Sequence, residues 1–203
     1  MRALFLSALS AVLLLGCGEA GTRTDAGRAG KTVSTGTADL GGPFVLVDET
    51  GATVTEAALV GQPSLIYFGF SYCPDVCPTA LQKLGAAQER IGKAGDDVQY
   101  VLFTVDPERD TPEQLGVYVT NNGFPVGLRA FTGTVEQVEV AKKAYKVFAQ
   151  KTPLEGSEAD YTVDHQDLIF LIGEDGQFVD YFPPNATPTE IAGRVRAYLA
   201  KGA

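Results

Sequence analysis

Two cysteines and one histidine are the residues of this chain whose types and spacing best suit chemistry. Cys73 and Cys77 stand close together in FGFSYCPDVCPTALQKLG, and His165 is the single histidine of the 203 residues. The only methionine is Met1 and there is no tryptophan. A soft sulfur and nitrogen site in the folded domain can therefore use only Cys73, Cys77 and His165, with carboxylates in reserve. Two thiolates and an imidazole suit copper in either oxidation state; they suit zinc less well, because structural zinc normally takes four such ligands.

The cysteine spacing allows more than one chemistry. Pro78 suits the first position of a helix, which places Cys77 at or beside the N-cap. We therefore expect the helix dipole to lower the pKa of Cys77 and favour its thiolate. Four helical residues span about 6 Å, which permits a disulfide between Cys73 and Cys77 and also lets both sulfurs bind one metal ion. A structural disulfide, a redox couple and a metal site all remain open at this point.

The elements around the cysteines can be read from hydrophobic patterns. FVLVDETGATV, residues 44–54, predicts a hairpin near the start of the domain. Nearly continuous apolar segments at 64–70 and 98–105 predict strands buried on both faces. A helix is expected after the cysteines, ending at Gly92.

Later elements follow from capping signals. Thr111, Thr134 and Thr187 are each followed three residues later by Glu or Gln, which predicts three further helix starts. Segments 168–172 and 177–182 predict a strand pair. The order predicts an α/β protein with a central mixed β-sheet flanked by helices and an N-terminal β-hairpin. Two cysteines between a buried strand and a helix indicate a thioredoxin-like fold.

His165 lies in YTVDHQDLIFLI, directly before the predicted strand at 168–172. In thioredoxin-like folds the loop before this strand faces the cysteine motif and usually ends in a cis-proline. There is no proline between Leu154 and Phe182, and His165 takes that place. We therefore expect His165 to face the cysteines; the alternative is a surface histidine without a role.

The N-terminal segment resembles a bacterial lipoprotein signal. MRALFLSALSAVLLLGC has one base, an apolar run too short to span a bilayer, and a cysteine after Gly16. We expect residues 1–16 to be removed, Cys17 to be lipidated, 17–40 to be a flexible tether and 41–203 to be the folded domain. The protein would then be extracytoplasmic, on the periplasmic side, and anchored to a membrane. The alternative is an ordinary secretory signal with an incidental Cys17; which membrane holds the anchor stays open.

Charge restricts the partners. The formal net charge is −9 and no basic run occurs, which argues against nucleic acid. Residues 154–167 contain acidic side chains and no base, so they form a solvated loop or steer a basic partner or cupric ion toward the site. We expect a monomer.

Three motifs carry a resemblance to a known family. FGFSYCPDVCPT, VDPERDTPEQL and YTVDHQDLIFLI occur in the order and spacing typical of the Sco/SenC family of copper-handling proteins. The resemblance extends over about residues 43–200. The third motif departs in detail, because Gln166 stands where the family often has serine.

This resemblance implies a membrane-tethered, thioredoxin-like protein that binds one copper ion, as Cu(I) or Cu(II), through Cys73, Cys77 and His165. It implies a role in assembling the binuclear copper site of cytochrome c oxidase, by delivering copper, by reducing the site's cysteines, or both. The expected partner is the copper-receiving subunit of the oxidase or another copper chaperone.

Acidic residues near the motifs have weaker assignments. Asp106 matches a family aspartate near the site; it is expected either to support or transiently bind the metal, or simply to shape the loop before Pro107. Asp164 either orients His165 or is an exposed acid. Arg109 and Asp110 are expected to form local ion pairs and caps.

Three functions compete for the same site. The first is a copper metallochaperone without turnover. The second is a thiol–disulfide oxidoreductase in which Cys73 and Cys77 are the redox pair, with Cys77 as the acidic thiol and Cys73 as its resolving partner. The third is a copper or redox sensor coupled to a membrane kinase.

Overall fold

The centre of the fold consists of two apolar strands that run in parallel. β3 (Ser64–Gly69) and β4 (Gln99–Thr104) pair from Ser64 opposite Gln99 to Gly69 opposite Thr104. Their side chains are almost all buried, as expected for strands covered on both faces. The predicted strands at 64–70 and 98–105 are thus confirmed. The structure, a computed structural model, describes residues 39–156 and 159–202.

The main sheet is mixed and has seven strands among the described residues. β3 and β4, and β4 and β5, are parallel, whereas the outer pairs are antiparallel. The order across the sheet is β2 (Thr53–Thr55), β1 (Val45–Asp48), β5 (Arg129–Thr132), β4, β3, β8 (Ile169–Ile172), β9 (Phe178–Phe182).

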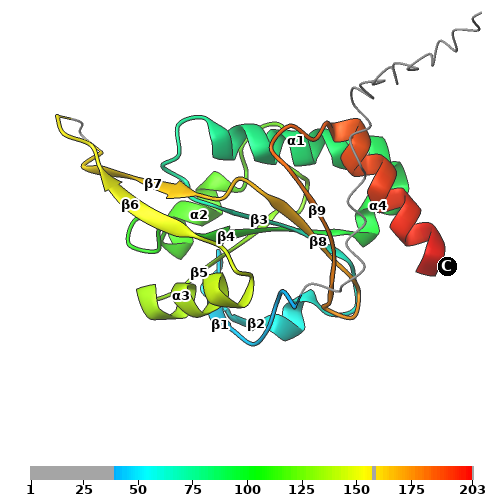
Figure 1. Cartoon of the computed structure of the whole chain (residues 1–203), viewed down its shortest axis with the longest axis horizontal. Helices are drawn as coiled ribbons and strands as arrows, with labels where there is room; N and C mark the ends of the chain where they lie inside the picture. The colour runs from blue at the N-terminus through cyan, green and yellow to red at the C-terminus, as the bar shows by residue number, and fades with distance from the viewer. Residues whose placement is uncertain (1–38, 157–158, 203) are drawn as a thin grey trace, which may run out of the picture. The chain divides into compact units, whose positions relative to one another are not determined.

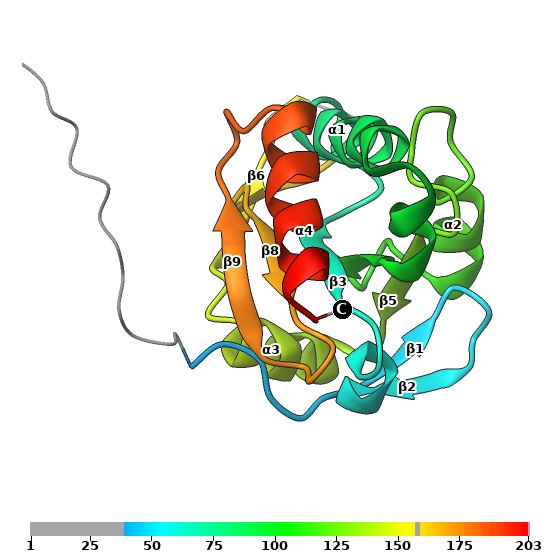
Figure 2. The same cartoon turned by 90° about the vertical axis from the view of Figure 1, so that its right-hand side faces the viewer.

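Helices cover both faces of this sheet. α1 and α4 lie side by side on one face, and α3 lies on the other (Figures 1 and 2). Short 3-10 helices occur at Glu56–Leu59 and Gly92–Asp97. The α-helices are α1 (Val76–Ile91), α2 (Pro112–Tyr118), α3 (Val135–Ala144) and α4 (Pro188–Gly202).

The two faces of the sheet bury different side chains. On the α3 side, aromatic rings form a continuous cluster in which Phe68 lies 5.0 Å from Phe103 and 5.4 Å from Tyr145, between ring centroids. On the α1 side, the ring of Tyr67 lies next to Cys77. Because neighbouring residues of a strand point to opposite faces, β3 contributes to both layers and holds the cysteine helix against the core.

Local signals account for the ends of the elements. The Asp48 carboxylate accepts hydrogen bonds from the backbone N–H groups of Thr50 and Ala52, which closes the predicted N-terminal hairpin. Thr111 and Thr134 cap α2 and α3 as predicted. Thr187 and Glu190 exchange hydrogen bonds at the start of α4. α1 ends at Ile91, with Gly92 as its C-cap, which agrees with the predicted stop at Gly92.

One element differs from the sequence-based expectation. Residues expected to form a loop build a separate antiparallel pair, β6 (Ala149–Pro153) and β7 (Tyr161–His165). In Figure 1 these strands project beyond the sheet. β7 shows no clear alternation of apolar and polar residues, because only Val163 among its residues is buried and the segment is rich in acidic side chains. His165 is therefore the last residue of a strand rather than part of an open loop.

The predicted membrane-targeting features lie outside the described residues. These are the signal segment 1–16, Cys17 and the tether up to residue 38. Among the residues that the structure does describe, no helix is long and apolar enough to cross a membrane.

Candidate metal centre

The cysteines lie where β3 leads into α1. Cys73 belongs to the connecting loop, and Cys77 is the second residue of α1, whose N-cap is Asp75. The backbone N–H of Cys77 donates a hydrogen bond to Cys73 Sγ at 3.3 Å. The first turn of the helix thus uses one of its unpaired N–H groups on a sulfur. Both thiols are free and buried.

Gly69 allows Cys77 to approach the strand. A Cβ atom at residue 69 would lie 2.7 Å from the Tyr67 ring and 3.1 Å from Cys77 Sγ. Any side chain here would displace the ring or the sulfur. The sequence motif contained this glycine, but its role becomes visible only once the strand and the helix are packed together.

His165 reaches the sulfurs from the end of β7. Its Nε2 lies 3.4 Å from Cys77 Sγ, and its Nδ1 lies 3.0 Å from the carbonyl oxygen of Gln166. The rings of Tyr67 and Phe70 meet the imidazole edge-on, with centroids 6.0 and 5.9 Å away. A proton on Nδ1, donated to the Gln166 carbonyl, leaves the Nε2 lone pair facing the sulfurs, which is the tautomer a metal ligand needs.

The three side chains form a ligand group. Ligand atoms of Cys73, Cys77 and His165 all lie within 4.8 Å of one another, and no other such group of His, Cys, Asp or Glu occurs in the described part of the chain. Two sulfurs and one imidazole nitrogen are soft donors that favour copper, and three donors are one fewer than structural zinc normally takes. The geometry brings together the three residues expected from the sequence.

The acidity of the two thiols is opposite to the sequence-based expectation. Hydrogen bonding from Cys77 lowers the pKa of Cys73 to about 4; burial opposes this shift, and His165 and the backbone N–H of Cys77 support it. The pKa of Cys77 is raised, by its interaction with the Cys73 sulfur and by burial. The expectation that the helix start would make Cys77 the acidic thiol is therefore wrong. Cys77 lies inside the helix, and its N–H points at Cys73.

The pKa of the imidazole is shifted by burial, by Cys73 and by the Gln166 carbonyl. Burial by itself lowers the pKa of His165, but hydrogen bonds to Cys73 and to the Gln166 carbonyl outweigh burial, and the net direction is upward. The Cys73 sulfur raises the pKa of His165, and the imidazole in turn lowers the pKa of Cys73, an interaction that activates thiols. In the metal-free protein the centre therefore favours a thiolate at Cys73.

Asp106 and Asp164 do not belong to the ligand group. Asp106 is fully buried, and its carboxylate accepts hydrogen bonds from Tyr161 at 2.7 Å and from Arg109 at 2.5 Å. Asp164 is exposed and accepts a hydrogen bond from Thr152 at 2.6 Å, across the hairpin. The carboxylate of Asp164 is thus engaged away from the imidazole, and Nδ1 of His165 faces a backbone carbonyl instead.

Sequence reasoning missed the role of Asp110. This buried carboxylate accepts hydrogen bonds from the backbone N–H and the hydroxyl of Ser71, with the hydroxyl at 2.5 Å, and from Thr104 at 2.6 Å. It holds the loop that carries Cys73. The sequence predicts local caps or ion pairs for Asp110. Its place in VDPERDTP was the available signal, but Ser71, the partner through which it holds the cysteine loop, is 39 residues away in the sequence.

The fold and the site together define a class of protein: a thioredoxin-like α/β protein with a centre of two cysteines and one histidine. A sequence model of the SCO1/SenC family matches residues 32–200, and this chain belongs to that family. The predicted thioredoxin-like fold and the predicted family are thus confirmed.

Individual relatives agree with this membership. The chain is 41% identical over 162 residues to the human "Protein SCO1 homolog, mitochondrial", covering 79% of this chain and 53% of the relative, so it spans about half of that protein. It is 40% identical to the copper-bound ScoI of Bradyrhizobium japonicum, with a TM-score of 0.71, covering 78% of this chain and 99% of that one. BsSco, described as a Sco-family cytochrome c oxidase assembly protein with a disulfide switch, is 25% identical, with a TM-score of 0.62 and coverages of 79% and 94%.

The thiol acidities lead to a prediction about reactivity. In the reduced, metal-free protein, iodoacetamide should alkylate Cys73 before Cys77, because Cys73 is the thiolate and Cys77 is a fully buried thiol. A lowered pKa keeps the thiolate present well below neutral pH and removes it only as the pH falls toward about 4. Peptide mapping by mass spectrometry across a pH series measures both effects. Faster modification of Cys77, or a midpoint at the ordinary thiol pKa, would contradict the assignment.

Proposed function

We propose that this protein is an extracytoplasmic copper chaperone that binds one copper ion through Cys73, Cys77 and His165 and serves assembly of the binuclear copper site of cytochrome c oxidase. The observation that carries the proposal is the convergence of these three ligand atoms within 4.8 Å in a member of the SCO1/SenC family. The copper-bound relative supports copper as the cargo.

The chain's own residues suit capture of copper. Cys73 is already a thiolate, so the first sulfur can bind without losing a proton. Cys77 must lose its proton when copper binds, and His165 must be neutral, so copper uptake should release protons and weaken in acid. The supporting rings of Tyr67 and Phe70 keep the imidazole oriented toward the sulfurs.

The surroundings of the centre suit transfer to a partner. Exposed apolar side chains lie on the segments beside it: Tyr72 and Val76 in the cysteine loop and first helical turn, and Phe148, whose backbone exchanges hydrogen bonds with Gln166 next to His165. Exposed aromatic and aliphatic groups around a buried site are typical of a surface that contacts another protein. The proposed partner is the copper-receiving subunit of the oxidase or another copper chaperone.

The ligand set can be tested by substitution. We expect the unmodified protein to bind one copper per chain, and Cys73→Ser, Cys77→Ser and His165→Ala each to weaken binding by more than about 100-fold, because loss of an outer-shell partner alone costs about 10–100-fold. Competition with a copper chelator measures this affinity. Asp164→Asn is the matched control beside His165; it should bind copper normally, since its carboxylate is engaged with Thr152. Stoichiometric copper retention by His165→Ala under competition would remove His165 from the ligand set.

The paired thiols also favour a second function, a thiol–disulfide oxidoreductase. The Cys73 thiolate would attack a substrate disulfide and form a mixed disulfide, releasing one substrate thiol. Cys77 would then displace the second substrate thiol and form the Cys73–Cys77 disulfide, so two electrons pass to the substrate. The lowered pKa of Cys73 and the raised pKa of Cys77 suit these two roles. The disulfide switch described for BsSco is consistent with this chemistry.

One variant separates the two functions. Disulfide exchange needs the two sulfurs, whereas the proposed copper centre also needs the imidazole. His165→Ala should therefore lose tight copper binding yet reduce a model disulfide at a rate within about tenfold of the unmodified protein, since neighbouring-base effects on such thiols are modest compared with loss of a sulfur. Stopped-flow measurement of the exchange provides the comparison. A collapse of exchange together with copper binding would tie both activities to His165.

We also propose that the chain is anchored through a lipidated Cys17 after removal of residues 1–16 and faces the periplasm. The apolar leader and the cysteine after Gly16 support this proposal. Cys17→Ser should move the protein from the membrane to the soluble extracytoplasmic fraction, and mass spectrometry of the N-terminal peptide should show the acyl chains only on Cys17. An unmodified N-terminal peptide from the membrane fraction would contradict the anchor.

A further inference from the structure

His165 is carried by an element that no ladder hydrogen bond ties to the main sheet. In the described residues, β6 and β7 pair only with each other, from Ala149 opposite His165 to Pro153 opposite Tyr161. Both strands extend past the sheet edge (Figure 1). The position of His165 relative to the sulfurs must therefore depend on side-chain contacts between this hairpin and the rest of the domain.

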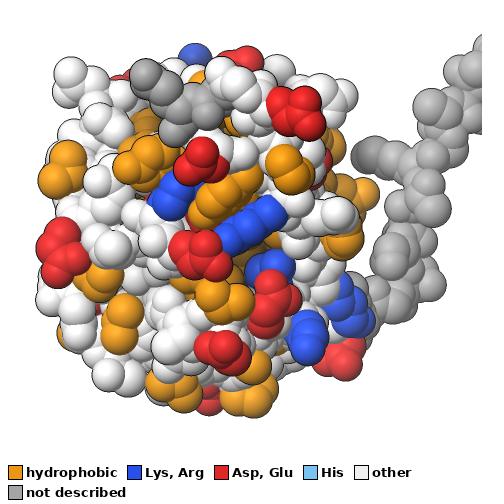
Figure 3. All heavy atoms as spheres, turned by 90° about the vertical axis from the view of Figure 1, so that its left-hand side faces the viewer, with side chains coloured by type: hydrophobic (Ala, Val, Ile, Leu, Met, Phe, Trp, Pro, Cys, Tyr) orange, Lys and Arg blue, Asp and Glu red, His pale blue; other side chains and the backbone are white. Residues whose placement is uncertain are grey.

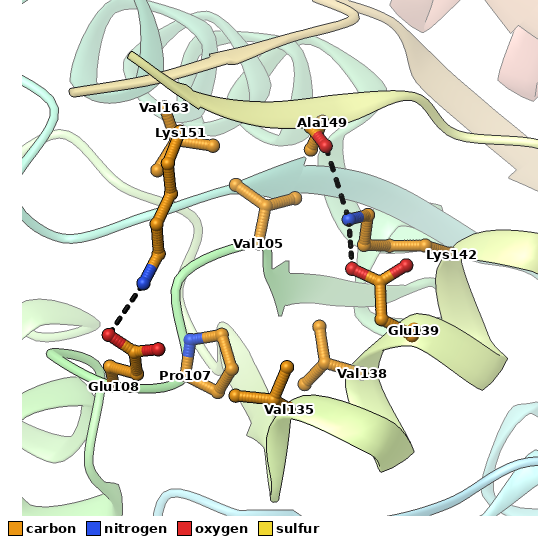
Figure 4. A pocket seen from close by; sticks show the side chains of 10 residues that line it. All are labelled: Val105, Pro107, Glu108, Val135, Val138, Glu139, Lys142, Ala149, Lys151 and Val163. Carbon is orange, nitrogen blue, oxygen red and sulfur yellow. Dashed lines mark hydrogen bonds and ion pairs between the residues drawn. The ribbon is translucent and has the colours of Figure 1, made fainter. Parts of the chain in front are cut away.

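Apolar packing beneath the hairpin is incomplete. A hollow of about 320 Å³ separates β6 and β7 from α3 and from the end of β4. Val105, Val138 and Val163 are among its lining residues (Figure 4). At its mouth, Lys151 pairs with Glu108 and Lys142 pairs with Glu139, both at 2.5 Å. On the face drawn in Figure 3, basic and acidic side chains lie side by side across hydrophobic ones. The Lys151–Glu108 pair is exposed and holds β6 only weakly. Lys142 is buried, its ion pair lies within α3, and it reaches β6 only through a long contact of 3.4 Å to the carbonyl oxygen of Ala149.

A stronger attachment lies at the other end of β7. The Tyr161 hydroxyl donates to Asp106 Oδ1 at 2.7 Å, and Arg109 Nε donates to Asp106 Oδ2 at 2.5 Å. Arg109 Nη1 donates to the Tyr161 carbonyl oxygen at 3.1 Å, and its guanidinium carbon lies 3.8 Å from the centroid of the Tyr161 ring. Asp106 is fully buried, so these charge-assisted bonds act away from solvent, where they are stronger.

The turn at residues 106–110, which contains Asp106 and Arg109, also holds the cysteine loop. Asp110 binds the backbone N–H and hydroxyl of Ser71, two residues before Cys73, and the guanidinium of Arg109 lies 4.9 Å from the ring centroid of Tyr72. Residues 106–110 therefore contact both segments that carry the ligands, namely the cysteine loop and β7. One face of the turn fixes the loop of the sulfurs and the other fixes the strand of the imidazole.

We propose that the turn at residues 106–110 is a clamp in which Asp106 and Arg109, through Tyr161, set the distance of His165 from the two sulfurs. This inference rests on the proposed copper site and assigns these residues a positioning role, without contact to the metal. Tyr161 and His165 are the ends of one strand, about 13 Å apart at roughly 3.3 Å per residue, so release of Tyr161 moves the imidazole while Asp110 still holds the sulfurs. When the clamp opens, the imidazole moves away from the two sulfurs. Copper would then lose His165 as a ligand before it loses the cysteines.

Tyr161→Phe tests the clamp, because it removes the hydroxyl bonded to Asp106 and keeps the ring under Arg109. In the metal-free protein, amide hydrogen exchange in β7 should become faster while exchange in α1 stays unchanged. With copper bound, the affinity for Cu(II) should fall about tenfold, as for loss of an outer-shell partner, and the imidazole nitrogen hyperfine coupling in electron paramagnetic resonance should weaken. Cu(I), which two sulfurs can hold, should be affected less.

Glu108→Gln is the matched control in the same turn, since it breaks the Lys151 ion pair to the hairpin but leaves the contacts among Asp106, Arg109 and Tyr161 in place. It should leave exchange in β7 and the imidazole signal unchanged. Unchanged exchange in β7 of Tyr161→Phe, or an equal effect from Glu108→Gln, would overturn the clamp. If the unmodified protein binds no copper, the proposed function fails, and the exchange comparison in metal-free protein still decides whether the clamp exists.

Discussion

In the first turn of α1, the backbone N–H of Cys77 donates a hydrogen bond to the sulfur of Cys73, and the rest of the centre is arranged around that contact. The side chain of Cys77, supported by His165 and by the N–H of Cys77, stabilises negative charge on Cys73, which lowers the pKa of this thiol. Cys77 itself lies in the helix and packs against β3. It fits there because Gly69 has no side chain that would meet its sulfur. Two sulfurs of identical chemistry thereby acquire different acidities, because Cys73 accepts hydrogen bonds from the side chain and the N–H of Cys77, whereas Cys77 is the donor and is buried more deeply.

The two halves of the ligand group are held in different ways. The sulfurs lie on elements packed into the main sheet and its helices, whereas His165 lies at the end of a hairpin outside that sheet, which is attached by Val163 in the core and by the polar contacts of Tyr161. A cargo protein has to bind its ion firmly and yet surrender it to a partner. Rigid sulfurs and a separately attached imidazole suit this requirement, since ligands can then be exchanged one at a time.

Copper binding and electron exchange draw on the same sulfurs. In the two proposed functions, a thiolate at Cys73 would serve as a soft ligand or as a nucleophile, and the buried Cys77 as the second ligand or as the group that closes a disulfide. His165 is what distinguishes the two chemistries, because only the copper centre requires its Nε2. Membership in the SCO1/SenC family agrees with copper handling, and the acidity of the pair explains why thiol exchange is also chemically available.

Much of the fold was accessible from local patterns. The buried strands β3 and β4, the hairpin closed by Asp48 and the helix starts at Thr111 and Thr134 follow from hydrophobic runs and capping residues, which act over a few neighbouring positions. The hairpin of β6 and β7 was not predicted, because its acidic and exposed residues give no clear alternation. β7 also contacts the turn at 106–110 through Tyr161, and no local pattern encodes that contact.

The sequence by itself determined which residues could form the centre: a chain with one histidine and one cysteine pair in its domain offers a single soft ligand set. Only the tertiary structure decided which thiol is acidic, since that depends on where the N–H of Cys77 points and on how deeply each sulfur is buried. Only the tertiary structure joined Asp106 to Tyr161 and Asp110 to Ser71. These bonds link residues far apart in the chain, and their existence depends on packing that brings the ends of separate strands to one edge of the sheet.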